Sequence, residues 1–299
     1  MLSKVRQPQH GGRLAIIAGR GRLPLDIAVA ARDAGEDPFL IPLIGEAGEI
    51  PSEFDQQAMS IADGKQLTSI IKAKGIDRLI MSGGINRRPE ASEVRLPLRL
   101  LWTTARIGRA LVGAGDDKLL RVVISMIETA GCRVIGAQEV VPDLLAETGP
   151  LAAASPDAAA RRDIAIACAG ANALGELDVG QGAVAVGGRI VALEGPEGTD
   201  GMLERVRQLK ETGRISGKRK GVLVKLCKPQ QDKRADLPSM GPDTVRNALR
   251  AGLAGIALDA GRSFVLDRDE VVREADRLGL FVVGIDREDP GPSIARGGS

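Results

Sequence analysis

The first half of the chain alternates short apolar runs with longer segments in which apolar residues recur every three or four positions. The apolar runs predict strands over residues 14–18, 38–44 and 78–81, and the amphipathic segments predict helices over 25–34 and 65–75. Strands that alternate with helices are typical of a parallel sheet with crossover helices. The first half is therefore predicted to be an α/β domain.

The second half begins with a predicted helix over 161–174 and continues with a predicted hairpin. The hairpin strands, 182–186 and 189–193, are separated by Gly187 and Gly188, which permit the tight turn of a two-residue loop. The remaining predicted elements are helices over 201–212, 242–251 and 268–278 and strands over 221–226, 255–258 and 280–284. This pattern predicts a second α/β domain.

An alanine-rich stretch at 151–160, interrupted by Ser155 and Pro156, separates the two halves. The expected organisation is a flexible N-terminus at 1–12, a first domain at 13–150, a linker at 151–160, a second domain at 161–286 and a flexible tail at 287–299. The predicted fold class is α/β, with two domains and a ligand cleft between them.

The composition excludes several classes of function. His10, in a polar stretch before the first strand, is the only histidine, so neither a Ser-His-Asp triad nor a histidine zinc site is expected. The cysteines, Cys132, Cys168 and Cys227, form no Cys-x-x-Cys pair and suggest no zinc knuckle or disulfide framework. With a net charge of +2 and 2% aromatic residues, nucleic acid is not an expected partner. Carboxylates, Lys or Arg, backbone amides and a hard metal ion are left to carry any chemistry.

Membrane insertion is not expected either. No run of 18 apolar residues is present and no apolar segment follows Lys4 and Arg6, so we expect no membrane span, no signal peptide and a cytoplasmic location. Segment 95–113 carries four arginines at helical spacing around Trp102. A solvated helix face is the favoured interpretation, and peripheral contact with the anionic inner-membrane surface is the alternative. These arginines are Arg95, Arg99, Arg106 and Arg109.

Gly19 and Gly21 lie between the first predicted strand and the helix predicted over 25–34, whose first turn Pro24 can occupy. Here the backbone can approach an anion closely, and the helix dipole favours negative charge. The segment is a poor dinucleotide fingerprint, because Pro24 replaces the third glycine and the second strand ends in Pro42-Leu43 without the acidic residue that would hold a ribose. We predict phosphate or sugar contact here; the alternative is a tight turn that needs glycine for its own geometry.

Three segments of the second half gather polar side chains around glycines. These segments are residues 178–181, 194–200 and 228–238. Each has a simple structural explanation: Thr199 or Asp200 can cap a helix, and Asp232 and Asp236 can pair with neighbouring cations. Together they supply carboxylates, an amide and cations at the ends of successive elements, where α/β proteins collect ligands. Such a set suits Mg²⁺ or Mn²⁺ and a diphosphate.

The longest of these motifs resemble the UDP-2,3-diacylglucosamine diphosphatase family of lipid A biosynthesis that is unrelated to the calcineurin-like phosphoesterases. In the first half the resemblance rests on IAGRGRLP at 17–24, GG at 83–84 with RP at 88–89, and GDDKLL at 115–120. In the second half it rests on DxGQ at 178–181, EGTDxM at 197–202 and KPxQDxRxDxP at 228–238. The motifs cover most of the chain, and the last two are long and specific.

The resemblance implies an N-terminal Rossmann-like domain, a C-terminal catalytic α/β domain, and hydrolysis of UDP-2,3-diacylglucosamine to lipid X (2,3-diacylglucosamine 1-phosphate) and UMP. It also implies dependence on Mg²⁺ or Mn²⁺ and a catalytic aspartate at Asp232. The residues predicted to bind substrate are Gly19, Gly21, Leu23, Pro24, Gly83, Gly84, Gln181, Thr199, Lys228, Gln231 and Arg234. The predicted metal ligands are Glu197, Asp200 and Asp236.

Two other classes of function stay open from the residues alone. Gly19 and Gly21 leave a nucleotide-dependent oxidoreductase as an alternative, which titration with NAD(P)H would test. A non-catalytic nucleotide or lipid carrier is the second alternative, if the acidic segments only bind. Release of UMP from the acylated UDP-sugar distinguishes an enzyme from such a carrier.

Overall fold

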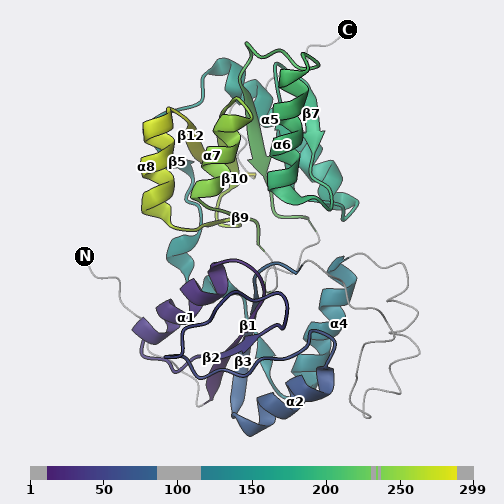
Figure 1. Ribbon diagram of the computed structural model, residues 1–299, viewed down its shortest axis with the longest axis vertical. Coiled ribbons are helices and arrows are strands. Elements are labelled where there is room, and N and C mark those ends of the chain that lie inside the picture. Colours follow the sequence, from purple (N-terminus) through teal and green to yellow (C-terminus); the bar gives the residue numbers. More distant parts are fainter. Residues whose placement is uncertain (1–11, 86–115, 230–233, 235–236, 288–299) are drawn as a thin grey trace. The chain divides into compact units, whose positions relative to one another are not determined.

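The structure is a computed structural model that describes residues 12–85, 116–229, 234 and 237–287, without the side chains of 116–119 and 122. The chain divides into two compact units (Figure 1). The first unit comprises residues 1–143 with 231–236, and the second comprises 144–230 with 237–299. The two-domain α/β organisation predicted from the sequence is confirmed.

The first unit is built on a parallel sheet with the strand order β2-β1-β3-β4. Its strands are β1 (Arg13–Ala18), β2 (Phe39–Pro42), β3 (Ile76–Ser82) and β4 (Arg133–Val134). The first three are the predicted strands. The fourth is two residues long and was not predicted, because only its pairing with β3 makes it a strand.

Helices connect these strands. They are α1 (Leu23–Asp33), α2 (Gly64–Ala73) and α4 (Asp116–Thr129), with short 3₁₀ turns at Ala137–Glu139 and Pro142–Leu144. The chain moves outward from β1 to β2 and then back across β1 to β3, so right-handed crossovers place α1 and α2 on opposite faces. Ala15 and Ile17 of β1 share one core with α2 and α4. The sequence analysis predicted α1 and α2 but missed α4.

The second unit contains a mixed sheet with the strand order β5-β12-β10-β8-β6-β7. Its strands are β5 (Gly149–Pro150), β6 (Gly182–Ala185), β7 (Ile190–Leu193), β8 (Gly221–Lys225), β10 (Leu253–Asp259) and β12 (Phe281–Ile285). Strands β8, β10 and β12 are parallel, whereas β5 and β6 are antiparallel to their neighbours β12 and β8. A separate parallel pair joins β9 (Ser239–Met240) and β11 (Phe264–Val265). Gly149–Pro150, which the sequence analysis placed at the end of the first domain, thus belongs to the second sheet.

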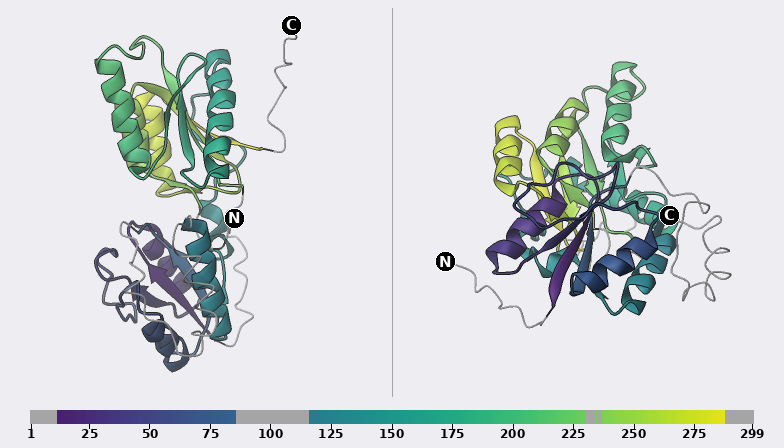
Figure 2. Two further views of the ribbon diagram at one scale, coloured as in Figure 1. Left: turned by 90° about the vertical axis from the view of Figure 1, so that its right-hand side faces the viewer. Right: turned by 60° about the horizontal axis from the view of Figure 1, so that its bottom comes forward.

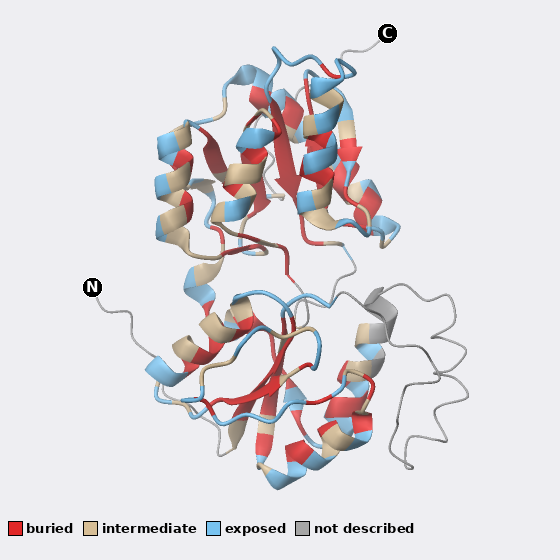
Figure 3. Cartoon of the chain, viewed as in Figure 1, coloured by how far each residue is buried: buried red, intermediate tan, exposed pale blue. Residues whose placement is uncertain are grey.

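Helices cover both faces of this sheet (Figure 2). Helix α5 (Ala158–Glu176) packs on one face, and α6 (Gly198–Glu211), α7 (Pro242–Arg250) and α8 (Arg268–Leu278) form a layer on the other. Alternate strand residues serve the two cores: Val184 and Leu223 face α6 to α8, whereas Ala183 and Val224 face α5. Buried residues accordingly concentrate in the strands and on the inner sides of the helices (Figure 3). No helix among the described residues is long and apolar enough to cross a membrane.

The predicted hairpin is confirmed and is held to α5 by a buried carboxylate. Gly187 and Gly188 have φ angles of 59° and 85°, the conformation that a two-residue hairpin loop requires. Asp163 of α5, only 3% exposed, accepts the N–H of Gly187 at 2.9 Å and that of Gly188 at 2.6 Å. One side chain therefore satisfies both amides of the turn.

Candidate functional site

The carboxyl edge of the second sheet, where β8, β10 and β12 end, brings the polar segments of the second half together. Because β6 is antiparallel to both β7 and β8, strand β7 also ends at this edge and β6 begins there. Glu194 follows β7, Lys228 follows β8 and Gln181 precedes β6. Ligands of α/β proteins bind outside the carboxyl ends of strands, so this edge is the candidate functional site.

Glu194 connects two predicted substrate-binding residues at this edge. Its Oε1 accepts the hydroxyl of Thr199 at 2.7 Å, and its Oε2 accepts the backbone N–H of Gln181 at 3.2 Å. The side chain is buried, with 7% of its surface exposed. The structure therefore brings Gln181 and Thr199 together, through a carboxylate that the sequence analysis placed in a polar segment but did not select.

The glycines of the 178–182 loop leave room for Glu194. A β-carbon on Gly180 would come within 2.3 Å of the backbone oxygen of Glu194. A β-carbon on Gly182 would come within 2.7 Å of its Oε2. The close approach between the loop and the end of β7 is thus possible because these positions lack side chains.

Lys228, a predicted substrate-binding residue, forms an ion pair with Asp178. The distance from Nζ to Oδ1 is 2.7 Å, and the side chains are 14% and 18% exposed. Asp178 has a φ of 55°, an unusual backbone conformation for a residue other than glycine. Such conformations persist where the surrounding structure holds them, often at functional sites.

A second group of charges at the carboxyl edge was not predicted. Asp259, at the end of β10 and 2% exposed, pairs with Arg287 at 2.8 Å and accepts the backbone N–H of Cys227 at 3.2 Å. Arg287 also donates to the carbonyl of Cys227. These contacts join the ends of β8, β10 and β12. The only signal in the sequence is an aspartate at the end of an apolar strand.

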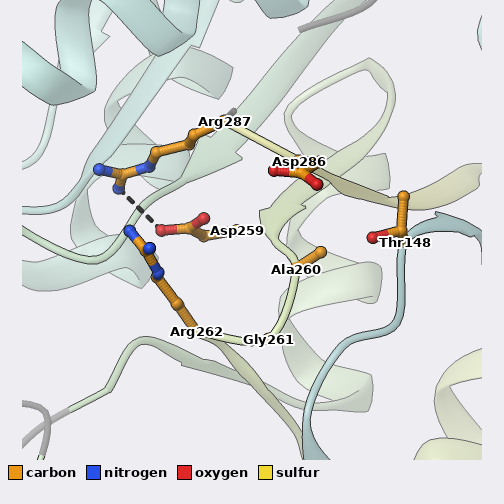
Figure 4. A pocket seen from close by; sticks show the side chains of 7 residues that line it. All are labelled: Thr148, Asp259, Ala260, Gly261, Arg262, Asp286 and Arg287. Carbon is orange, nitrogen blue, oxygen red and sulfur yellow. Dashed lines mark ion pairs between the residues drawn. The ribbon is translucent and has the colours of Figure 1, made fainter. Parts of the chain in front are cut away.

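Asp259 and Arg287 also line a pocket of about 270 Å³ (Figure 4). Its walls are Thr148, Asp259, Ala260, Gly261, Arg262, Asp286 and Arg287. Asp259 lies at the centre of the view, with the guanidinium groups of Arg262 and Arg287 beside it. Two arginines and two aspartates give the pocket wall no net formal charge, so its charge does not select an anion.

Two of the predicted metal ligands have protein partners. Glu197 pairs with Arg205 at 3.0 Å, and Asp200 accepts a hydrogen bond from Asn247 at 2.9 Å. Within the described ranges, no three His, Cys, Asp or Glu side chains gather closely enough to hold a metal ion. The third predicted ligand, Asp236, lies outside these ranges.

Several other predicted residues also lie outside the described parts of the chain. They are Asp232 and Gln231, and the arginines Arg95, Arg99, Arg106 and Arg109. Arg234 is described and pairs with Glu128 of α4 at 2.7 Å. The structure therefore places Arg234 with the first unit and leaves the role of Asp232 as a prediction.

In the first unit, the predicted glycine residues lie at the carboxyl edge of its sheet. The backbones of Arg20 and Gly84 exchange two hydrogen bonds, at 2.8 and 3.0 Å. A β-carbon on Gly19 would come within 2.6 Å of the oxygen of Gly84, and one on Gly83 within 2.7 Å of the oxygen of Arg20. These two glycines are therefore needed for the contact between the loops after β1 and β3.

Gly21, Leu23 and Pro24 continue from this contact into α1. Gly21 has a φ of 96° with open space around its Cα, and Leu23 and Pro24 begin the helix. Arg22 pairs with Asp26 in the first turn at 3.1 Å. Phosphate or sugar contact at this loop stays a prediction.

Two helix-covered sheets, the second with polar side chains gathered at its carboxyl edge, define a two-domain α/β protein. The chain matches the LpxI N-terminal domain over residues 13–144 and the LpxI C-terminal domain over residues 147–283. It is 38% identical over 280 residues to the UDP-2,3-diacylglucosamine pyrophosphatase LpxI of Caulobacter vibrioides, covering 93% of this chain and 99% of that protein. The chain belongs to the LpxI family, as the resemblance of its motifs predicted.

Proposed function

We propose that this protein hydrolyses the diphosphate of UDP-2,3-diacylglucosamine to lipid X and UMP. The observation that carries the proposal is the match to the Caulobacter pyrophosphatase over almost the full length of both chains. Because both family domains are present, the proposal does not depend on a single shared module.

The described residues support specific roles at the carboxyl edge of the second sheet. Lys228 is a cation suited to a diphosphate oxygen, and Asp178 holds its ammonium group in place. Thr199 and Gln181 supply polar contacts on the side of Glu194. Asp232 remains the proposed catalytic carboxylate, which would orient or deprotonate the attacking water.

Turnover of UDP-2,3-diacylglucosamine by the purified protein tests the proposal. We expect UMP and lipid X in equal amounts, and Asp232→Ala should reduce the rate on the order of 100-fold or more. Asp37→Ala is the matched control, because Asp37 lies in the first unit with 82% of its side chain exposed. Absence of UMP release by the wild-type protein would leave a carrier as the function. A rate within a few-fold of wild type for Asp232→Ala would remove that residue from the mechanism.

The proposal includes Mg²⁺ or Mn²⁺, which would neutralise charge on the diphosphate. Glu197 and Asp200 have the right chemistry, but their contacts with Arg205 and Asn247 do not form a closed metal site by themselves. Removal with EDTA should stop turnover and Mg²⁺ should restore it, and calorimetric titration of the metal-free protein should show binding. Full activity of a metal-free preparation would reject the metal.

Membrane contact is a further part of the proposal. One support is the substrate, whose two acyl chains favour an apolar environment by about 0.8 kcal/mol per buried methylene. The other is the set of arginines at 95, 99, 106 and 109. We expect sedimentation with anionic vesicles at low salt, reduced when Arg99 and Arg106 are changed to glutamate. Unchanged sedimentation in that variant would make this segment an ordinary solvated surface.

A further inference from the structure

Glu194 accepts hydrogen bonds from two donors at the carboxyl edge of the second sheet. Its Oε1 is 2.7 Å from the hydroxyl oxygen of Thr199, and its Oε2 is 3.2 Å from the backbone nitrogen of Gln181. With only 7% of its surface exposed, the side chain lies between the loop before β6 and the beginning of α6. A carboxylate in this place has a direct consequence for what Thr199 can bind.

A threonine hydroxyl carries one hydrogen and two lone pairs. When the hydrogen is donated to Glu194, the oxygen of Thr199 can only accept. The backbone N–H of Gln181, which would otherwise suit an anion, is also donated to Glu194. Phosphate oxygens are acceptors, so this side of the edge does not suit the diphosphate, whereas an O–H or N–H group finds a partner there.

The position of Glu194 is built into the loop. A β-carbon at position 182 would lie 2.7 Å from Oε2 of Glu194. The carboxylate therefore occupies space that the side chain of any residue other than glycine would fill. Gly180 allows the backbone of Glu194 to approach in the same way. The two glycines thus leave room for Glu194 beside the loop, where its carboxylate accepts from Gln181 and Thr199.

We propose that Glu194 is a positioning residue of the hydrolase: it holds the Thr199 hydroxyl as an acceptor for an O–H or N–H donor of the substrate. The proposal rests on the proposed function. The polar residues at this edge then have different roles. Lys228 interacts with the diphosphate, and the Thr199 oxygen accepts a hydrogen bond from a neutral donor group of the substrate. Glu194 itself need not touch the substrate.

A double-mutant cycle tests this proposal. Glu194→Gln, Thr199→Val and the double variant are compared with the wild type for kcat and KM with UDP-2,3-diacylglucosamine. Each single variant should lower kcat/KM about 10-fold, the effect of losing one hydrogen bond worth about 1.4 kcal/mol. The double variant should be no worse than Thr199→Val, because Glu194 acts through Thr199. Thr199→Ser should keep most of the activity.

The sign of the Glu194→Gln effect distinguishes the two possible roles of Thr199. If Thr199 donated to the diphosphate, removing the competing carboxylate would raise kcat/KM. An increase, or additive losses of about 100-fold in the double variant, would overturn the proposal. Glu204→Gln is the control, since Glu204 is a half-exposed residue of helix α6, which also contains Thr199.

Two measurements keep the outcome clear. Circular dichroism and thermal melting report whether Glu194→Gln folds, and Glu194→Asp, with a side chain too short for both contacts, replaces it in the cycle if it does not. The same cycle on the dissociation constant of UDP-2,3-diacylglucosamine applies even if the wild-type protein binds without turnover. Failure of the proposed function is therefore seen in the wild type, and failure of the Glu194 proposal in the cycle.

Discussion

The ammonium group of Lys228 lies 2.7 Å from the carboxylate of Asp178, a residue 50 positions earlier in the chain. Asp178 adopts a φ of 55°, and both side chains are largely buried. An ion pair of this kind orients a lysine that would otherwise sample many rotamers, and it compensates a charge that is mostly removed from water.

Asp178→Asn should therefore raise KM about 10-fold while the protein stays folded. Asparagine tolerates a positive φ, so the backbone conformation is retained, but the negative charge that holds Lys228 is lost. Steady-state kinetics with UDP-2,3-diacylglucosamine and a thermal melt measure the two effects. A KM equal to that of the wild type would show that the pair does not position Lys228 for the substrate.

Asp163→Ala should destabilise the second unit by about 2 kcal/mol or more, because the N–H groups of Gly187 and Gly188 lose a buried carboxylate as their acceptor. Asp157→Ala is the comparison on the same helix. Asp157 caps α5 by accepting the N–H of Ala160 at 2.7 Å, and losing a helix cap costs about 1 kcal/mol. Urea unfolding of both variants gives the difference. A smaller effect at Asp163 than at Asp157 would contradict the role assigned to the turn.

Gly180→Ala should reduce both stability and activity, because the new β-carbon meets the backbone oxygen of Glu194 and not a flexible side chain. We expect a loss of about 1–3 kcal/mol, as for other overpacked sites. Gly217→Ala is the matched control: nothing lies within 4 Å of its added β-carbon, and the smaller entropy of the unfolded chain should leave it neutral or slightly stabilised. Equal melting temperatures for the two variants would exclude the close approach at Gly180.

The thiols of Cys132 and Cys168 should react slowly in the folded protein. Burial raises the pKa of Cys132 to about 12 and that of Cys168 to about 11, although Arg287 lowers the latter in part. At pH 8 few of these groups are thiolates, and only the thiolate is reactive. Labelling with a thiol reagent in the absence and presence of urea measures the difference.

The same pKa shifts predict how stability depends on pH. The folded state keeps the thiol protons to a higher pH than the unfolded state, whose thiols titrate near 9.0. Stability from these groups is therefore complete below about pH 9 and is lost as the pH rises toward 11 and 12. Urea unfolding at pH 7.5 and pH 10 should show this decrease, and Cys168→Ala should make it smaller. If the free energy of unfolding falls by the same amount between pH 7.5 and pH 10 in Cys168→Ala, a group other than Cys168 causes the decrease.

The sequence by itself determined the type of most elements and the family of the chain. Apolar residues at regular spacing predict a helix or a strand wherever the element is long enough to show its period, as for β1, α1, α5 and β8. The two glycines at 187–188 predicted the hairpin because their backbone freedom is a local property. The family was recognisable because its motifs are long and survive in order along the chain.

The tertiary structure decided which of these residues meet. Two-residue strands such as β4 and β5 exist only through their pairing, which no local pattern records. The contacts of Glu194 with Thr199 and Gln181 follow from the order β8-β6-β7, because antiparallel pairing brings the beginning of β6 and the end of β7 to one edge. Spacing along the chain contains no information on that order. Strand order is determined by contacts between residues far apart in the sequence, through burial on both faces of the sheet. This order brings the polar residues of the proposed site to one edge.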